Sequence, residues 1–438
     1  MPSHRVLLIS YLFPPCGESG VQRNLKYARY LPDFNWKPFV LTTKDITYHA
    51  YDYSLLSELP NEVVIIRAES FDPHRLSALI RPPKSPQKAN EIFRNKNISK
   101  HPRLLRIYRK LRDWLAFPDA NVGWIPFAFQ KGVNAIREYK IDIIVGSVGP
   151  YTSAILSKML SRKTGIPYVL DFRDGWLDDP HINRPTRLHR WAHRVVEKSI
   201  VANANAVCVY GDFLYQKFSS RYPQLVGRMD VLTNGFDSSD CDGIDPAPKT
   251  IGWRRVVFCG TMYEYFAPHF QQLISALRLL PDKILKTLEI VFVGRVELPD
   301  AQEQIVSAGL DRHVKLLGYM QHQHALSFLI SADAALLFLP IGDIQSYSGK
   351  IFEYFMIKRP ILAGIEPEGT CAALLRQIGQ SDWIVPPANS ERLCEAITSL
   401  AEKGWPRPDN NQIDQFSRKS LTGRLASRLK DTIEHHTL

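Results

Sequence analysis

The sequence predicts a two-domain α/β protein with a parallel sheet in each domain. Short runs rich in Val, Ile, Leu and aromatic residues alternate with segments of helical spacing along the 438 residues. A stretch rich in Gly, Asp and Pro, NGFDSSDCDGIDPAPKTIGW (234–253), interrupts this alternation midway. A glycine-containing loop follows the first apolar run and leads into a helical segment. These three features predict two Rossmann-like domains joined by one linker.

The domain limits and the strands follow from this alternation. The first domain is expected at 1–240, with a polar, basic, proline-containing insertion at about 69–116. A linker at 241–253 precedes the second domain at 254–410, and a helix within 411–438 is expected to pack back onto the first domain. Strands are predicted at 5–10, 38–43, 63–67, 141–147, 168–172, 206–210, 256–259, 288–293, 314–317, 334–339, 360–363 and 383–385.

The loop after the first strand has the composition of a ligand-binding turn. In YLFPPCGESGVQRNLKYARYL (11–31), two prolines end the strand, while Gly17 and Gly20 permit positive φ and close approach to the backbone. Val21, Leu25 and Leu31 resume helical spacing, so a helix is expected to begin near residues 19–20 with unpaired amides that favour a phosphate. A plain strand-to-helix turn explains the same residues equally well.

Composition limits the class of protein. The formal net charge of +11 favours polyanions or an anionic membrane surface, but no base-stacking platform or groove-reading helix is recognisable, so nucleic acid is not expected as a partner. The six cysteines include no CxxC pair, and neither a zinc site nor a disulfide framework is indicated. No stretch approaches the roughly 20 apolar residues that span a bilayer. A cytoplasmic protein is expected, at most peripheral at the inner face of the cytoplasmic membrane.

The second domain repeats one feature after each of its first three strands. The strands are followed by the pairs Gly260-Thr261, Gly294-Arg295 and Gly318-Tyr319. Because the carboxyl ends of parallel strands lie at one edge of a sheet, a ligand is expected to approach the backbone at all three loops.

A second helix start in this domain carries charge. In SYSGKIFEYFMIKRPILAG (346–364), Ser348 and Gly349 precede a helix that opens with Lys350 and carries Glu353. A lysine at a helix N-terminus indicates another phosphate-type anion site. Glu353 is either a capping-box partner of this helix start or an acceptor for the hydroxyls of a ribose.

Seven stretches in order carry a family resemblance. They are YLFPPCGESGVQRNLKYARYLP, FPDANVGWIPFA (117–128), GSVGPYTSAIL (146–156), GIPYVLDFRDGW (165–176), NGFD (234–237), FVGR (292–295) and SGKIFEYFMIKRPILA (348–363). In this order the chain resembles the retaining, nucleotide-sugar-dependent glycosyltransferases of family 4, which have the GT-B fold of two Rossmann-like domains facing each other across a cleft. The resemblance implies a UDP- or GDP-linked sugar donor, and because fixed cations neutralise the leaving group, no metal or other cofactor is required.

Carried over position by position, the resemblance assigns a donor site. Its residues are Gly17, Ser19, Gly20, Gly260, Thr261, Arg295, Tyr319, Ser348, Gly349, Lys350 and Glu353. Glu353 would hold the ribose hydroxyls, while Arg295 and Lys350 would neutralise the diphosphate, because the family's usual Arg-Lys pair is not evident here. The first glutamate of the family's E-x7-E motif is Gln345 in this chain, and the backbone amides of 346–349 are the expected substitute.

The loop DFRDGW (171–176) supplies the catalytic candidates. One of Asp171 and Asp174 would accept the acceptor hydroxyl's proton or help to hold the sugar, with Arg173 beside them. Alternatively, Asp171 and Arg173 form a structural ion pair that shapes the loop. Asp240 and Asp242 form a DxD sequence, but they lie in the expected linker, so no metal site is predicted.

The insertion raises the question of a membrane. A helix at about 102–115 would be apolar on one side and surrounded by Arg and Lys, and basic residues are dense from 94 to 116. This pattern resembles an interfacial helix on anionic lipid. A helix that packs its apolar stripe on the first domain and solvates its basic face explains it as well.

The sequence therefore predicts a retaining glycosyltransferase of hexosyltransferase type. It would move a sugar from a nucleotide donor to a glycan or lipid-linked acceptor in the assembly of a cell-surface polysaccharide, such as an exopolysaccharide or lipopolysaccharide. The alternatives are a GT-B-fold sugar-nucleotide epimerase and a nucleotide-sugar-binding protein without turnover. Gln345 and the missing Arg-Lys pair motivate the last of these.

Overall fold

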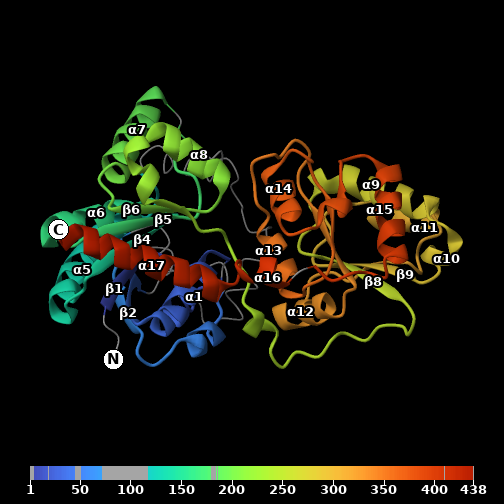
Figure 1. Cartoon of the computed structure of the whole chain (residues 1–438), viewed down its shortest axis with the longest axis horizontal. Coiled ribbons are helices and arrows are strands. Elements are labelled where there is room, and N and C mark those ends of the chain that lie inside the picture. Colours follow the sequence, from blue (N-terminus) through green and yellow to red (C-terminus); the bar gives the residue numbers. More distant parts are fainter. Residues whose placement is uncertain are drawn as a thin grey trace, which may run out of the picture. The chain divides into compact units, whose positions relative to one another are not determined.

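The computed structural model describes residues 4–17, 19–44, 51–71, 117–178, 184, 186–408 and 410–437 (Figure 1). The chain forms two compact units, Met1–Thr233 with Arg418–Leu438, and Asn234–Ser417. Nearly all of the expected insertion, including the basic segment 94–116 and the helix expected at about 102–115, lies outside the described residues. None of the described helices has the length and apolar composition needed to cross a bilayer.

The first unit is built on a parallel sheet of seven strands in the order β3-β2-β1-β4-β5-β6-β7. The strands are β1 (His4–Ile9), β2 (Trp36–Thr43), β3 (Val64–Ala68), β4 (Ile143–Val148), β5 (Tyr168–Phe172), β6 (Ala206–Val209) and β7 (Met229–Val231). Its helices are α1 (Gln22–Tyr30), α5 (Ile125–Tyr139), α6 (Thr152–Thr164), α7 (Arg187–Val201), α8 (Asp212–Arg221) and α17 (Arg418–Thr437). The sequence predicted six of these strands and missed β7, a three-residue edge strand too short to show an apolar run.

Helices cover both faces of this sheet, and β1 shows how the core is divided between them. Leu7 and Ile9 belong to a buried cluster that includes side chains of α5 and α6, whereas Val6 and Leu8 belong to another that includes α1 and α17. Successive side chains of a strand point to opposite faces, so a strand that is apolar throughout is covered on both sides. The continuous apolar runs in the sequence have this cause.

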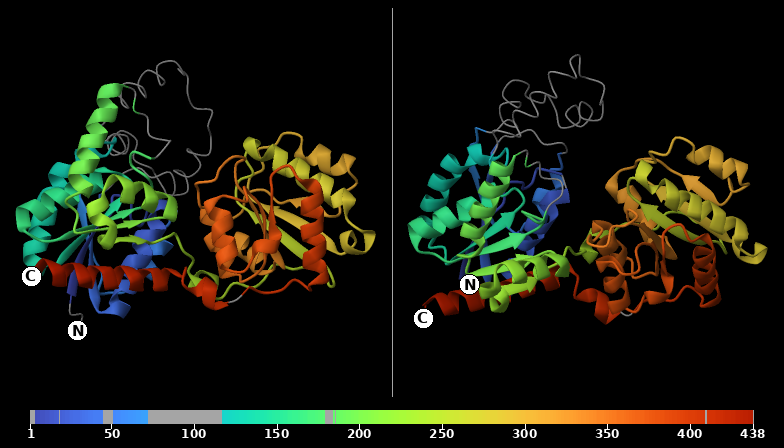
Figure 2. Two further views of the ribbon diagram at one scale, coloured as in Figure 1. Left: turned by 45° about the horizontal axis from the view of Figure 1, so that its top comes forward. Right: turned by 90° about the horizontal axis from the view of Figure 1, so that it is seen from above.

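Helix α17, the last segment of the chain, packs beside α1 on the first unit (red in Figure 2). Leu421, Leu425 and Leu429 are buried in the cluster that it shares with α1 and β1. The Arg428 guanidinium forms a salt bridge with Asp230 in β7. The first unit therefore ends at Thr233 rather than at 240 and takes up the chain again at Arg418.

The second unit has a parallel sheet of six strands in the order β10-β9-β8-β11-β12-β13. The strands are β8 (Arg254–Cys259), β9 (Leu288–Val293), β10 (Val314–Leu316), β11 (Ala334–Phe338), β12 (Ile361–Gly364) and β13 (Ile384–Val385). The helices are α9 (Ala267–Leu279), α10 (Asp282–Leu285), α11 (Ala301–Ser307), α12 (His322–Ile330), α13 (Gly349–Met356), α14 (Thr370–Gln377), α15 (Ser390–Glu402) and α16 (Asn410–Asp414). The expected linker packs against this unit, because Ala247 N donates to Ser327 O at 2.9 Å and Lys249 Nζ lies 2.7 Å from Asp333 Oδ2.

A buried ion pair holds α1 against the sheet of the first unit. Arg23 donates to both carboxylate oxygens of Asp171, at 2.6 and 2.7 Å, and its remaining donors reach Leu232 O at 2.9 Å and Thr233 O at 2.7 Å. The two side chains are 3% and 0% exposed. The sequence-based pairing of Asp171 with Arg173 is wrong, because Arg23 engages both carboxylate oxygens from a helix that is distant in sequence.

Replacement of Arg23 alone is expected to destabilise the first unit strongly. In Arg23→Met the Asp171 carboxylate stays buried without its counter-ion, and loss of one partner of such a pair costs about 3–5 kcal/mol. Urea unfolding followed by tryptophan fluorescence measures the loss, with Arg137→Met, at an exposed position of α5, as the control. The double variant Arg23→Met/Asp171→Leu should recover much of the stability. A loss below about 1 kcal/mol in Arg23→Met would contradict a structural role for the pair.

Candidate functional site

Three glycines meet at the carboxyl ends of β8, β9 and β10. Gly260, Gly294 and Gly318 have φ values of +133°, +127° and +72°. The Gly294 amide donates to Gly318 O at 2.8 Å, and a Cβ on Gly294 would lie 2.2 Å from Gly260 O. That contact is with backbone, which cannot turn aside, so no side chain fits at Gly294. The three loops that the sequence singled out therefore form one surface of closely packed backbone.

Lys350 lies on this surface from the first turn of α13. A Cβ on Gly260 would be 2.4 Å from Lys350 Cε and 2.5 Å from Nζ, so the glycine makes room for the lysine. The ammonium is 4.3 Å from the centroid of the Phe258 ring, within cation–π range. Burial lowers the pKa of Lys350, although the nearby Cys259 and Glu353 oppose this shift. A half-buried cation at a helix N-terminus, where the dipole is also positive, favours a bound anion.

The start of α13 corrects one interpretation of Glu353. Ser348 is the N-cap residue, and its Oγ accepts a hydrogen bond from Lys350 N at 3.3 Å. The third helical residue is Ile351, so Glu353 lies two positions beyond the capping-box position. The capping-box alternative is therefore wrong. Glu353 is exposed in the second turn of the helix.

Tyr354 fixes α13 to the sheet, and the sequence analysis missed it. Its hydroxyl accepts a hydrogen bond from Cys259 N at 3.0 Å and donates one to Leu336 O at 3.0 Å. The side chain is fully buried. It joins the helix that carries Lys350 to the end of β8 and the middle of β11. In sequence, a tyrosine on the apolar face of a helix is indistinguishable from ordinary core.

The segment around Gln345 is held by its own side chains. Asp343 Oδ1 accepts hydrogen bonds from the amides of Gln345, at 3.2 Å, and of Ser346, at 3.0 Å. The Ser346 amide is thus engaged within the loop. Of the amides expected to replace the family's first glutamate, those of 347–349 are the better candidates.

Arg295 and Tyr319 extend the surface beyond the glycines. The guanidinium carbon of Arg295 lies 5.9 Å from the centroid of the Tyr319 ring, and both side chains are exposed. Met262 N donates to Arg295 O at 2.7 Å, which ties the segment after the half-buried Thr261 to the loop after β9. Arg295 is a second cation beside the glycine loops of this unit.

In the first unit, Arg173 explains why residue 20 is glycine. Arg173 Nη1 donates to Gly20 O, and a Cβ on Gly20 would lie 2.9 Å from Nη2. Gly17 packs against Asp52, whose Cβ is 3.2 Å from an added Cβ, and neither glycine has a positive φ. The positive φ that these glycines permit is not adopted, and the close approach that they allow is made by the chain's own atoms. A 3₁₀ turn, Ser19–Val21, then leads into α1.

The loop after β5 is clamped by aromatic side chains. Trp176 stacks on Tyr151 with ring centroids 4.7 Å apart and donates Nε1–H to His193 Nδ1 at 2.9 Å. Tyr151 in turn donates its hydroxyl to Gly175 O at 3.1 Å. Burial above all lowers the pKa of His193 to about 4, so its imidazole is neutral at pH 7 and can accept the bond. The loop that holds the catalytic candidates is therefore fixed on both sides.

The three candidates in this loop differ in access to solvent. Asp171 is buried in its ion pair, Arg173 is half-buried against Gly20, and Asp174 is exposed. The Asp174 carboxylate lies 3.1 Å from the position of an added Cβ on Gly149, at the turn before α6. Asp174 is the carboxylate of the three that a substrate can reach. In the described part of the chain, no three His, Cys, Asp or Glu side chains gather as a metal site would need.

Two family models match, one in each half of the chain. A glycosyl transferase 4-like domain matches residues 81–235, and the model described as glycosyl transferases group 1 matches residues 254–403. Each half of the chain therefore matches a model of a glycosyltransferase domain. No curated protein matches its sequence significantly.

Solved structures share the architecture of these glycosyltransferase domains at low identity. A glycosyltransferase from Rickettsia africae ESF-5 is 14% identical, with a TM-score of 0.59 over 98% of this chain and 99% of that one. A lipopolysaccharide outer core galactosyltransferase is 11% identical, with a TM-score of 0.52 over 98% and 99%. A Listeria monocytogenes protein described as a UDP-N-acetylglucosamine 2-epimerase is 11% identical, with a TM-score of 0.53 over 98% and 97%. These likenesses concern the fold alone, and the predicted GT-B class is confirmed.

Gly260→Ala is expected to weaken nucleoside diphosphate binding at least tenfold, because the added Cβ must displace Lys350. The positive φ adds backbone strain of about 1–3 kcal/mol. Gly309→Ala is the matched control, since Gly309 also has a positive φ, of +69°, but nothing lies within 4 Å of an added Cβ. Calorimetric titration and thermal unfolding of both variants separate the two effects. Equal affinities in the two variants would show that the contact with Lys350 has no part in binding.

Proposed function

We propose that the chain is a retaining glycosyltransferase that moves a sugar from a nucleotide donor to a glycan or lipid-linked acceptor in the assembly of a cell-surface polysaccharide. The observation that carries the donor half of this proposal is the half-buried Lys350 ammonium, held against the Gly260 backbone at the start of α13. Such a site suits the diphosphate of a nucleotide sugar. The retaining course is inferred from the family resemblance.

The proposed chemistry uses fixed charge. As the bond to the sugar breaks, negative charge develops on the nucleoside diphosphate. Lys350, Arg295 and the N-terminal dipole of α13 would stabilise that charge where it forms. Glu353, exposed in the second turn of the helix, would accept hydrogen bonds from the ribose hydroxyls. The remaining donor contacts are assigned to Thr261, Tyr319, Ser348 and Gly349 in this unit.

On the acceptor side, Asp174 is proposed to receive the proton of the acceptor hydroxyl or to orient the sugar. It is the exposed carboxylate of its loop, and Arg173 lies next to it in sequence. Asp171 is assigned a structural role because both of its oxygens are held by Arg23.

The cell-surface setting rests on coarser support. One structural neighbour is a lipopolysaccharide outer core galactosyltransferase, at 11% identity. A location in the cytoplasm, at the inner face of the membrane, would bring a lipid-linked acceptor within reach. Contact of 94–116 with anionic lipid belongs to the same proposal, and that segment lies outside the described residues.

The first experiment is a calorimetric titration of the whole chain with UDP, GDP and their common sugar conjugates. One nucleotide is expected to bind, and Glu353→Ala should weaken it by about tenfold or more, because two ribose hydrogen bonds to a carboxylate are lost. Glu303→Ala, at an exposed position of α11, is the control. Binding without turnover on any acceptor would favour the non-catalytic alternative, and interconversion of the free nucleotide sugar would favour an epimerase. No binding of any nucleotide would overturn the proposal.

Diphosphate binding should also weaken at a lower pH than an ordinary lysine would allow. Burial lowers the pKa of Lys350 from its usual 10.5. The side chain is therefore fully charged at low pH, and as the pH rises it loses its proton at a lower pH than an exposed lysine does. Titrations between about pH 7 and pH 10 should show affinity falling in the wild-type protein and a flat, weak profile in Lys350→Gln. Lys283→Gln, at an exposed site on α10, should keep the wild-type profile. Parallel profiles for Lys350→Gln and the wild type would exclude Lys350 as the titrating group.

A further inference from the structure

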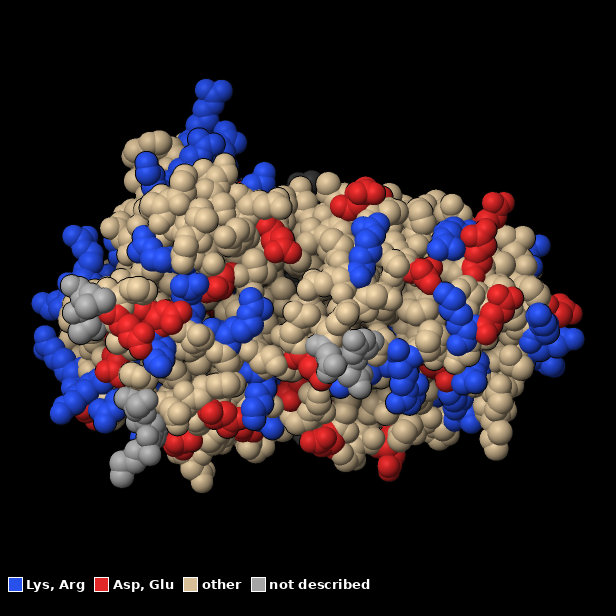
Figure 3. Space-filling model, in the orientation of Figure 1, with Lys and Arg blue, Asp and Glu red and all other residues tan. Residues whose placement is uncertain are grey.

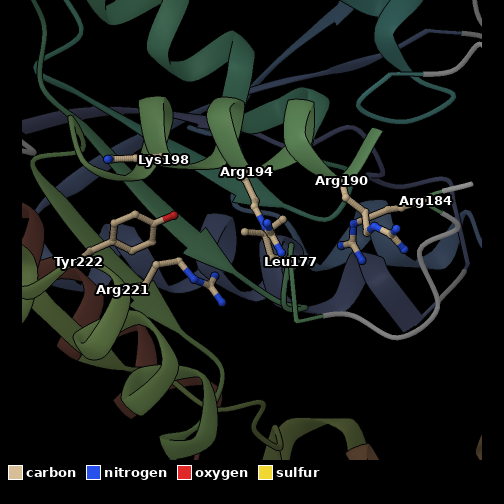
Figure 4. Close-up of a pocket in the computed structure, with 7 residues that line it drawn as sticks. All are labelled: Leu177, Arg184, Arg190, Arg194, Lys198, Arg221 and Tyr222. Carbon is tan, nitrogen blue, oxygen red and sulfur yellow. The ribbon is translucent and has the colours of Figure 1, made fainter. Parts of the chain in front are cut away.

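A cavity of about 570 Å³ in the first unit is lined mainly by cations (Figure 4). It is bounded by α7, the end of α8 and the segment that follows the DFRDGW loop. The cationic side chains that line it are Arg184, Arg190, Arg194, Lys198 and Arg221. Leu177 and Tyr222 complete the described lining. The Lys and Arg side chains that gather over α7 are visible at the upper left of Figure 3.

Helix α7 concentrates three of these charges on one stripe. Arg190, Arg194 and Lys198 are spaced four residues apart, so they lie one above another on the same side of the helix. All three are exposed, while His193 and Glu197, which lie next to this stripe on the helix, three residues after Arg190 and Arg194, are buried. Like charges at this spacing destabilise a helix by about 0.2–0.5 kcal/mol per pair. The arrangement opposes helix stability and is therefore not explained by folding.

The carboxylates that the structure describes near the cavity do not neutralise that stripe. The buried Glu197 accepts hydrogen bonds from Leu177 N at 2.9 Å, Tyr222 Oη at 2.7 Å and Arg221 Nη1 at 2.6 Å. Burial raises the pKa of Glu197, and these donors oppose the shift. Asp178 also binds Arg221, at 2.8 and 3.0 Å. Both carboxylates are thus used to fix Arg221 in place.

The charges of the three α7 cations are not compensated by any carboxylate that the structure describes. Arg190, Arg194 and Lys198 form no salt bridge with any residue that the structure describes. Their guanidinium and ammonium groups face a cavity far larger than a single water molecule. A cavity with excess positive charge and fixed walls is a site for an anion.

We infer that this cavity binds a phosphate-type anionic group of the acceptor substrate. The inference rests on the proposed function. Arginine offers paired donors in a planar fork that matches two phosphate oxygens, and three or more such groups suit a phosphate or pyrophosphate better than one carboxylate. The position agrees, because Leu177 in the lining lies three residues after Asp174, the carboxylate assigned to the acceptor hydroxyl. A phosphate held here would anchor the acceptor next to the DFRDGW loop.

An apolar stripe beside the cations points to the competing occupant. Leu188, Trp191 and Val195 are 69%, 61% and 46% exposed and also follow helical spacing on α7. Together with the basic stripe they could rest on an anionic bilayer. The cavity favours a discrete ligand, because a bilayer surface would not fill a concave site bounded by α8 and the Leu177 segment.

The test is a titration of the full chain with inorganic pyrophosphate. The cavity variant replaces the three cations of α7, as Arg190→Gln/Arg194→Gln/Lys198→Gln. We expect it to lose at least tenfold in affinity for pyrophosphate and to bind nucleotide as the wild type does. The matched control is Lys131→Gln/Arg137→Gln/Arg162→Gln, which removes the same charge from exposed positions of α5 and α6. Lys350→Gln identifies pyrophosphate that binds at the donor site. Failure of nucleotide binding would count against the proposed function alone, because the pyrophosphate comparison does not depend on it.

The source of the phosphate is distinguished by two further probes. Tighter binding of geranyl diphosphate than of pyrophosphate would support a lipid-linked acceptor, and tighter binding of glucose 6-phosphate would support a phosphorylated glycan. Equal pyrophosphate affinity in the cavity variant and the control would overturn the inference. Vesicles of phosphatidylglycerol and phosphatidylcholine give the remaining outcome. If the cavity variant loses vesicle binding but keeps pyrophosphate binding, the cations serve a membrane surface instead.

Discussion

Parallel pairing of every strand within each sheet decides where chemistry can occur in this chain. Parallel strands bring all their carboxyl ends to one edge, so the loops after β8, β9 and β10 meet although they are far apart in sequence. The loops converge so closely that a Cβ on Gly294 would lie 2.2 Å from Gly260 O. At Gly260 and Gly294 there is no room for a side chain, so this edge of the second unit is formed by backbone with positive φ. The rest of the donor surface is arranged around that backbone.

Arg23 and Lys350 are both cations partly or wholly removed from water, and the protein compensates for this loss of hydration in two different ways. Arg23 finds a carboxylate and two carbonyls within the fold, and all of these partners are internal. Lys350 instead lies against glycine backbone and an aromatic ring at a helix N-terminus, an environment that lowers its pKa. Removing a cation from water costs free energy unless an anion binds to it. This contrast supports a structural role for Arg23 and the proposed anion-binding role for Lys350.

The sequence predicted elements better than contacts. Apolar runs predicted twelve of the thirteen strands that the structure describes, because a strand covered on both faces must be apolar throughout. The glycines after β8, β9 and β10 were also visible, and the φ values of +133° at Gly260 and +127° at Gly294 are ones that other residues rarely adopt. Partners separated by long stretches of chain were not visible. Arg23 in α1 looks like a solvated helix charge until β5 brings Asp171 beside it, and Gly20 looks like a ligand contact until Arg173 is placed against it.

The basic stripe of α7 shows the limit of reasoning from one sequence. Its spacing of four residues is plain along 190–198, but a charged stripe on a helix is most often a solvated face. Two three-dimensional facts change this interpretation. Glu197 and Asp178 both bind Arg221, and the side chains of the stripe line a cavity. Like charges stacked on one helix oppose its stability, and no carboxylate in the described chain offsets them there. An anion supplied by a substrate removes that repulsion, so binding and local stability would be gained together.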